Sequence, residues 1–380
     1  MGGENVNNTD STLPVAETTA NKPLPFLPEE LIVIILLRLP VRSLLRFKCV
    51  CKSWKTLFSD THFANNHFLI STVYPQLVAC ESVSAYRTWE IKTYPIESLL
   101  ENSSTTVIPV SNTGHQRYTI LGSCNGFLCL YDNYQRCVRL WNPSINLKSK
   151  SSPTIDRFIY YGFGYDQVNH KYKLLAVKAF SRITETMIYT FGENSCKNVE
   201  VKDFPRYPPN RKHLGKFVSG TLNWIVDERD GRATILSFDI EKETYRQVLL
   251  PQHGYAVYSP GLYVLSNCIC VCTSFLDTRW QLWMMKKYGV AESWTKLMSI
   301  PHENLLISNI SLWPCVEPLF ISENGVVLLM NTSSSQLILY NLNSRGLYFP
   351  RIPPSYLNIY YIEPKLDLHI YHESLLSPQC

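Results

Sequence analysis

The first strongly apolar part of the chain is one short segment with few polar residues. Residues 31–37 carry no polar side chain, and Arg38 and Pro40 interrupt the run. A run this short cannot span a bilayer, which needs about 20 apolar residues. Pro28 suits the start of a helix, and Pro40 favours a second helix after it. The pattern therefore predicts two or three short helices in the stretch 27–54.

Beyond Phe68 the spacing of hydrophobic residues changes. Short apolar or alternating runs are separated there by turn residues, as is typical of an all-β domain. Weakly repeated units start near Phe68, Ile120, Tyr161, Phe217, Tyr263 and Phe320. Units of roughly 40 to 55 residues predict a β-propeller of about six four-stranded blades. An irregular sandwich or two stacked β domains would satisfy the same strand count, since neither a Trp-Asp dipeptide nor a kelch-type glycine pair marks the units.

Local signals in the β region specify turns and packing. Asn125-Gly126 predicts a tight hairpin, because both positions tolerate a positive φ. We expect the tryptophans of this region to anchor the packing of the blades. Those we assign to this role are Trp141, Trp224, Trp283 and Trp294.

Composition narrows the class of protein. A net charge of +5 over 380 residues, without a block of like charges, gives no indication of nucleic-acid binding. Residues 1–22 lack the apolar core of a signal peptide and are predicted to be a disordered leader. We therefore expect a cytoplasmic or nuclear protein without a membrane segment, in which the 12 cysteines are reduced.

The helical stretch resembles the F-box, in particular its plant form. The resemblance rests on Leu27-Pro28-Glu29-Glu30-Leu31, Arg38-Leu39-Pro40-Val41 and Cys49-Val50-Cys51-Lys52-Ser53-Trp54. It implies three short helices that bind a Skp-type adaptor, which joins a cullin-RING ubiquitin ligase. The residues it assigns to the adaptor surface are Leu27, Pro28, Leu31, Ile35, Leu39, Pro40, Leu44, Leu45, Val50, Cys51 and Trp54. Some of these must instead hold the helices together, and Ile34, Leu37 and Phe47 are the first candidates to exchange roles with them.

The β region is similar to the F-box-associated domain (type 1, F-box/kelch-like) of plant F-box proteins, a group that includes the pollen S-locus F-box proteins. The similarity rests on GSCNGFLCL, LWNPSI, YGFGYDQVNHKYKLLAV, VSGTLNWIV, ILSFDIEKETYRQVLLP and LWMMKKYGVAESWTKL, in the same order as in the family. The resulting domain prediction is a leader at 1–22, an F-box at 23–67, a propeller-like β domain at 68–362 and a tail at 363–380.

Catalytic motifs are scarce. GxSxG, GxxxxGK[ST] and HExxH are absent, and Gly162-Phe163-Gly164 lacks the third glycine of a dinucleotide fingerprint. Cys268, Cys270 and Cys272 would share one face of a strand and could begin a zinc site, although buried core cysteines are the commoner case. We therefore predict a protein without catalytic residues, cofactor or metal.

The function that these patterns favour is substrate recognition in a Skp-cullin-F-box (SCF) ubiquitin ligase, with the β domain recruiting a target for ubiquitination and proteasomal degradation. The target and the loops that bind it are not determined by the sequence. Variable segments between the motifs are candidates, namely 76–90, 180–202, 206–212 and 252–260. The alternative is a propeller that binds protein or glycan outside a ubiquitin ligase.

Overall fold

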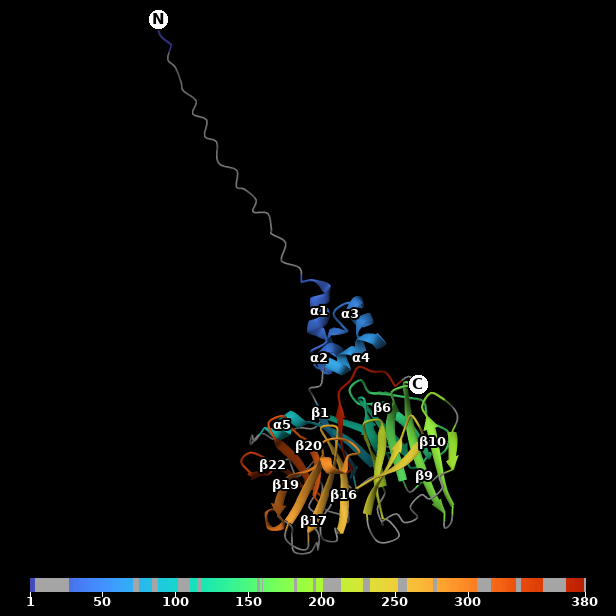
Figure 1. Cartoon of the computed structure of the whole chain (residues 1–380). Coiled ribbons are helices and arrows are strands. Elements are labelled where there is room, and N and C mark those ends of the chain that lie inside the picture. Colours follow the sequence, from blue (N-terminus) through green and yellow to red (C-terminus); the bar gives the residue numbers. More distant parts are fainter. Residues whose placement is uncertain are drawn as a thin grey trace.

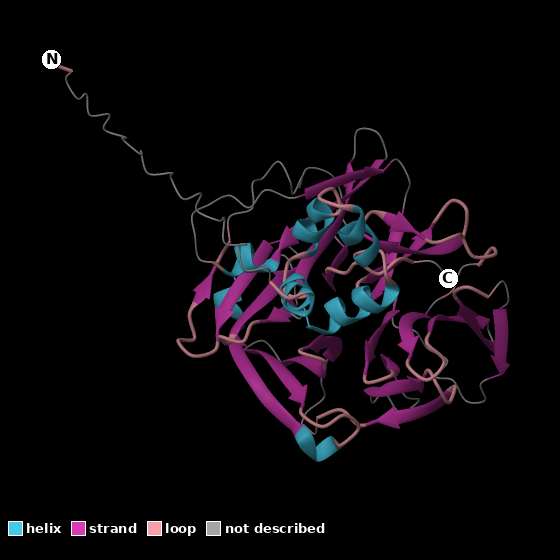
Figure 2. Ribbon diagram, turned by 90° about the horizontal axis from the view of Figure 1, so that it is seen from above, coloured by secondary structure: helices cyan, strands magenta, loops and turns pink. Residues whose placement is uncertain are grey.

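A group of helices sits on one face of a ring of β-sheets (Figure 1 and Figure 2). The computed structural model describes residues 1–3, 27–70, 75–83, 88–101, 110–114, 118–155, 158, 160–180, 183–193, 196–200, 213–227, 233–251, 258–275, 279–305, 316–332, 336–350 and 367–378. Apart from its first three residues, the predicted leader at 1–22 lies outside the described residues.

Four short helices form the helical module, residues 27–70. They are α1 (Glu29–Leu36), α2 (Val41–Phe47), α3 (Lys52–Leu57) and α4 (Thr61–Ile70). Pro28 and Pro40 directly precede α1 and α2, where a fixed φ and a missing N–H do no harm. The expectation of three helices misses α4, which also continues past the predicted boundary at residue 67.

A compact core holds the four helices together. Leu36, Leu44, Phe58 and Phe63 are buried and belong to one hydrophobic cluster. Phe58 packs against Phe63 with ring centroids 5.4 Å apart. Asp60 Oδ1 accepts a hydrogen bond of 2.9 Å from the backbone N–H of Phe63 and so stabilises the start of α4. These contacts pack the four helices against one another.

The strands form six four-stranded blades, which confirms the predicted propeller and its blade number. The strands are β1 (Pro75–Val83), β2 (Thr88–Pro95), β3 (Val110–Gly114), β4 (Tyr118–Cys124), β5 (Phe127–Asp132), β6 (Cys137–Asn142), β7 (Leu147–Lys148), β8 (Tyr160–Asp166), β9 (Lys171–Phe180), β10 (Ile183–Thr190), β11 (Cys196–Glu200), β12 (His213–Val218), β13 (Thr221–Asp227), β14 (Ala233–Asp239), β15 (Thr244–Val248), β16 (Tyr258–Leu265), β17 (Cys268–Phe275), β18 (Arg279–Met285), β19 (Trp294–Pro301), β20 (Val316–Ile321), β21 (Val326–Asn331), β22 (Gln336–Asn341), β23 (Leu347–Tyr348) and β24 (Asp367–His372). Five blades follow the chain order, from β4–β7 to β20–β23, and parallel pairing of β8 with β12 merges two of them into one eight-stranded sheet. A short helix, α5 (Ile96–Leu100), joins β2 to β3.

The innermost strands form a closed ring. In order around the axis they are β4, β8, β12, β16, β20 and β24, and each contacts the next. The predicted unit starts at Ile120, Tyr161, Phe217, Tyr263 and Phe320 each fall on one of these strands. The start near Phe68 is wrong, because that residue belongs to α4.

The sixth blade explains why the predicted unit start near Phe68 is wrong. Its innermost strand is β24, which pairs antiparallel with β1 and brings Tyr371 opposite Gln76. Strands from the two ends of the domain thus share one blade, and their hydrogen bonds close the ring. The predicted domain end at residue 362 is therefore too early, and the predicted tail at 363–380 contributes a strand to the propeller.

A repeated turn that the sequence analysis missed shapes the hairpins. Asp or Asn stands four residues before a residue of positive φ, as in Asp166 before His170 (φ 52°) and Asp239 before Glu243 (φ 54°). The Asp166 Oδ1 atom accepts from the N–H groups of Val168 and Asn169 at 3.1 and 3.0 Å. Side-chain acceptance of this kind replaces backbone partners within the turn. The same spacing recurs from Asp132, Asn142 and Asn341 to Arg136, Asn146 and Arg345.

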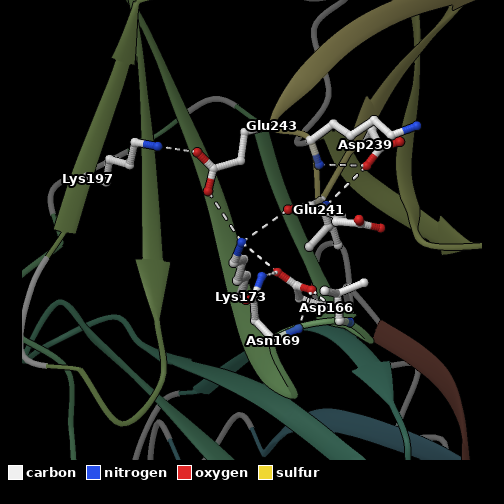
Figure 3. Close-up of polar contacts among 10 residues, drawn as sticks. Asp166, Asn169, Lys173, Lys197, Asp239, Glu241 and Glu243 are labelled. Carbon is white, nitrogen blue, oxygen red and sulfur yellow. Dashed lines mark hydrogen bonds and ion pairs between the residues drawn. The ribbon is translucent and has the colours of Figure 1, made fainter.

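Two of these turns meet in an ion-pair network between neighbouring blades (Figure 3). Lys173 Nζ lies 2.8 Å from Asp166 Oδ2, 3.3 Å from Glu243 Oε1 and 3.1 Å from the Ile240 carbonyl oxygen. The Asp166 side chain is fully buried and that of Lys173 is 11% exposed, whereas Lys197, which pairs with Glu243, is 67% exposed. The buried part of this network couples β9 to the turn between β14 and β15.

The network should make stability depend on acid pH. Burial by itself would raise the pKa of Asp166, but hydrogen bonds from Asn169 and Lys173, with the charge of Lys173, lower it to about 2. The pKa of an aspartate in an unfolded chain is about 4. The stabilisation that comes from the lowered pKa of Asp166 is therefore complete above that pH and is lost as the pH falls towards about 2. Asp166→Asn retains the oxygen that accepts the turn hydrogen bonds. Its unfolding free energy in urea should therefore fall less between about pH 7 and about pH 3 than that of the unchanged chain. Parallel pH profiles would contradict this assignment.

Close packing between blades accounts for two of the expected tryptophan anchors. Trp141 and Trp224 are both 2% exposed, and Trp224 Nε1 donates to the Tyr161 carbonyl oxygen at 3.1 Å. A Cβ at Gly162 or Gly215 would come within 2.8 or 2.6 Å of the Trp224 ring, so the indole requires glycine at both positions. The half-buried Trp294 donates from Nε1 to the Leu249 carbonyl oxygen at 3.0 Å, whereas Trp283 is half-buried and faces Lys296.

Candidate adaptor-binding surface

Helix α1 leaves a row of apolar side chains uncovered. Leu27, Leu31, Ile34 and Ile35 are 48%, 48%, 45% and 51% exposed. The spacing of Leu31, Ile34 and Ile35 places these three along one side of the helix, and Leu27 stands two residues before its start. Leu36 lies on the other side of α1 and is 3% exposed. We call this exposed set the α1 row.

The row is exposed because the helix is apolar all round and only one side of it meets the core. Ile32 and Val33 pack at the edge of the hydrophobic cluster that contains Leu36 and Leu37. Glu29 and Glu30 stand in the first turn, where negative charge is favoured by the helix dipole. Exposed apolar residues grouped on one helix side are characteristic of protein interaction sites.

A second exposed apolar position lies at the junction of α2 and α3. Val50 is 64% exposed, and the Cys51 next to it is exposed as well. The Cys51 sulfur accepts from the backbone N–H of Trp54 at 3.4 Å, so the cysteine caps α3. Trp54 is half-buried, with its ring centroid 5.4 Å from that of Phe47 and 6.1 Å from that of Phe58.

The structure divides the eleven assigned residues into three groups. Leu27, Pro28, Leu31, Ile35, Val50 and Cys51 are exposed, and Leu39, Pro40, Leu45 and Trp54 are half-buried. Leu44 is 0% exposed in the core of the module. Of the residues expected to exchange roles, Ile34 lies on the surface, Leu37 is buried and Phe47 is half-buried. No periodicity could separate these cases, because the partner helices decide which side is covered.

The division into exposed and buried residues predicts that two leucine substitutions lower the stability of the helical module by different amounts. Leu44→Ala should destabilise the helical module by about 2 to 5 kcal/mol, because it opens a cavity in a packed core. Leu31→Ala should change the unfolding free energy by less than about 0.5 kcal/mol, because its side chain is half solvated. Thermal unfolding followed by the helical circular dichroism signal would measure both. Equal losses of stability would show that α1 and α2 pack differently from this structure.

The helical module carries an excess of positive charge. Arg38, Arg42, Arg46, Lys52 and Lys55 are exposed, whereas the acidic residues of the module are Glu29, Glu30 and Asp60. Partial burial, together with the charge of Lys55, lowers the pKa of Lys48. An excess of cations around an apolar row favours a partner with an acidic surface and speeds its association.

The module presents α1 and α3 on the side away from the propeller, whereas α2 and α4 lie next to the ring of sheets (Figure 1). Ile145, in the turn between β6 and β7, packs against the hydrophobic cluster of the module. A partner bound to α1 would therefore approach from the side opposite the propeller.

The cysteines singled out in the sequence belong to the propeller core. Cys270 and Cys272 are 0% and 8% exposed on β17, and burial raises the pKa of each thiol to about 12. Both remain protonated at neutral pH and pack with Trp280 and Leu282 in one cluster. No helix in the described ranges is long and apolar enough to cross a membrane.

The fold and the exposed row define a two-part protein, in which a small helical interaction module is carried on a six-bladed propeller. Two family models match it, the F-box domain over residues 24–66 and the F-box associated β-propeller domain over residues 77–377. The chain therefore belongs to the F-box proteins with an F-box associated β-propeller domain, and the resemblance stated from the sequence is confirmed.

Relatives from Arabidopsis thaliana extend over most of the chain. The F-box/kelch-repeat protein At3g23880 is 32% identical over 339 residues, which cover 85% of this chain and 90% of the relative. The F-box protein CPR1 is 23% identical over 367 residues, covering 87% of this chain and 86% of the relative.

Proposed function

We propose that the chain is the substrate-recognition subunit of an SCF ubiquitin ligase. The helical module docks on a Skp-type adaptor, through which it joins a cullin-RING ligase, and the propeller recruits a target protein for ubiquitination and proteasomal degradation. The single observation that carries this proposal is the α1 row, which is uncovered in a module that matches the F-box domain.

The adaptor surface that we propose is centred on the exposed residues. Leu31 and Ile35 are exposed members of the α1 row one helical turn apart, and Val50 and Cys51 add a second contact. Burial of side chains like these against a partner supplies most of the binding free energy of an apolar interface, with charges at the rim. Leu44 is buried in the core of the helical module, where it holds α2 in place.

The contribution of the chain to ubiquitin transfer is positioning, without catalytic residues or cofactor of its own. A target held on the propeller has a raised effective concentration near the ligase to which the adaptor is bound. The chain would work in the cytoplasm or the nucleus, where its thiols stay reduced.

We place the target on the propeller face away from the helical module. The turn between β6 and β7 meets the module, so the connections from one blade to the next end on the opposite face, because strands of a blade alternate in direction. Four of these connections span residues 201–212, 249–257, 302–315 and 349–366, whereas the β4–β5 turn is only Asn125 and Gly126. Long connections on a rigid scaffold commonly carry binding function. Tyr134, in the β5–β6 turn on that face, is 94% exposed.

Two of the four segments first suggested for target binding need revision. The segment 76–90 follows β1 and β2 over most of its length, and 180–202 contains β10 and β11, so much of each lies within blades. The segment 206–212 and most of 252–260 are outside the described residues. The first of these lies between β11 and β12 in the sequence.

Affinity purification of the full chain from plant extract, followed by mass spectrometry, tests the proposal. We expect a Skp-type adaptor and a cullin in the eluate, together with candidate targets. Absence of both, from a chain that is folded and soluble, would favour the alternative, a protein- or glycan-binding propeller that acts outside a ubiquitin ligase.

A further inference from the structure

A short segment after β24 lies between the helical module and the propeller (Figure 1). It comprises residues 373–378, which form neither helix nor strand, and we call it the strap. Ser374 and Leu375 are nevertheless 0% and 5% exposed, and Pro378 is buried. Burial of this degree in an irregular segment requires partners on both sides.

The propeller holds the strap by side-chain hydrogen bonds to its backbone. Asn142 Nδ2, itself fully buried, lies 3.0 Å from the Ser374 carbonyl oxygen, 2.9 Å from Ser374 Oγ and 2.8 Å from the Leu376 carbonyl oxygen. Ser144 Oγ accepts from the Ser374 N–H at 3.2 Å. A Cβ at Gly126 would come within 2.3 Å of Ser374 Oγ, so the β4–β5 turn leaves room for the strap. These contacts fix its path along the rim of one blade.

The helical module holds the strap by apolar packing. Leu375 belongs to the same buried cluster as Leu44, Phe58 and Phe63, so a residue from the end of the propeller completes the core of the helices. Leu376 contacts this cluster and also the propeller cluster around Phe127. The covalent connection between the two parts is residues 71–74 alone.

We propose that the strap sets the orientation of the helical module on the propeller, with Leu375 and Asn142 as its positioning residues. The chain passes between the two parts once before β1, and the strap adds a second attachment after β24, next to the contact that Ile145 makes with the module. Two attachments at separate points restrict rotation of the module more than one does. If the proposed function holds, the consequence is that the target-binding face is held at one fixed distance and angle from the adaptor. The coupling itself does not depend on that function.

Distances between the two parts measure this coupling directly. One fluorophore is attached to Thr56 of α3 and the other to Glu323 in the β20–β21 turn, both exposed, through non-natural amino acids because the chain holds 12 cysteines. Single-molecule energy transfer in the full-length chain should give one narrow distance distribution. Leu375→Asp and Asn142→Ala should each convert it into a broad one, because each detaches the strap from one of its two partners.

Leu147→Asp is the matched control, since Leu147 is 47% exposed on the neighbouring β7 and is not part of the hydrophobic cluster that contains Leu375. Its distribution should stay as narrow as that of the unchanged chain. A broad distribution in the unchanged chain would overturn the proposal, and so would narrow distributions in both strap variants. If Leu375→Asp loses the helical signal of the module, Asn142→Ala decides alone, because Asn142 contacts the strap from the propeller.

Adaptor binding separates this proposal from the proposed function. Asn142→Ala should bind a purified Skp-type adaptor as tightly as the unchanged chain, because the α1 row lies on the other side of the module. An unchanged chain that binds no adaptor but shows the narrow distribution would refute the ligase assignment and leave the strap proposal standing. Loss of adaptor binding in Asn142→Ala with an unchanged distance distribution would refute the strap proposal.

Discussion

Aspartate at both Leu31 and Ile35 is expected to abolish binding of a Skp-type adaptor while the propeller stays folded. Both residues are exposed in the α1 row and would be covered by the partner. An interface anchor contributes at least about 2 kcal/mol, and a carboxylate buried in an apolar interface adds a further cost. The two changes together should weaken binding by at least about a thousandfold. Titration calorimetry with purified adaptor would measure the loss.

A matched control uses two other exposed apolar residues of the same module. Leu69 and Ile70 at the end of α4 are 73% and 47% exposed, and their replacement by aspartate introduces the same charge away from the α1 row. This variant should bind the adaptor normally. Normal binding by the Leu31/Ile35 variant would refute the proposed surface, and a loss confined to the Leu69/Ile70 variant would move the interface to α4.

Lys173→Met is expected to destabilise the propeller by about 3 kcal/mol, because it leaves the buried Asp166 carboxylate without its cation. The Lys173 ammonium is 2.8 Å from Asp166 Oδ2 and also contacts Glu243, so its removal strands a charge between two blades. Methionine keeps most of the side-chain volume, so the loss reflects charge more than packing. Urea unfolding at neutral pH, monitored by tryptophan fluorescence, would measure it.

Lys197→Met provides the comparison within the same network. Lys197 also pairs with Glu243, but its side chain is 67% exposed, and exposed pairs contribute about 0 to 1 kcal/mol. The double variant Asp166→Asn/Lys173→Met should recover part of the loss, because no buried carboxylate then lacks a cation. Equal effects of the two single lysine substitutions would show that burial does not govern this network.

Part of the fold follows from short-range signals. Pro28 and Pro40 mark the starts of α1 and α2. Asn125 and Gly126 form the tight β4–β5 turn with φ values of 48° and 77°, as their residue types predict. Five of the six innermost strands can also be found from the spacing of apolar runs. The turns in which Asp or Asn stands four residues before a residue of positive φ also recur along the sequence. The spacing of hydrophobic residues does not reveal them.

The adaptor surface was only partly predictable. The resemblance to the F-box proposed its residues, but Leu44 and Ile34 are both apolar helix positions in the same segment. The structure buries Leu44 completely and leaves Ile34 at 45% exposure. Which side of each helix is covered depends on α3, α4 and the strap, and the last of these comes from the other end of the chain.

The sequence by itself determined the class of this protein: short helices with a partner motif, followed by strands in repeated units. Backbone preferences and apolar periodicity act within a few residues of one another, so they are readable along the chain. Only the tertiary structure decided how the ring closes through β24, which apolar residues stay exposed, and how Asp166 is neutralised by Lys173. It also brought Asn142 to Ser374 across 232 positions of sequence. Burial, ion pairing and the strap depend on segments that meet only after folding, and no local pattern encodes their meeting.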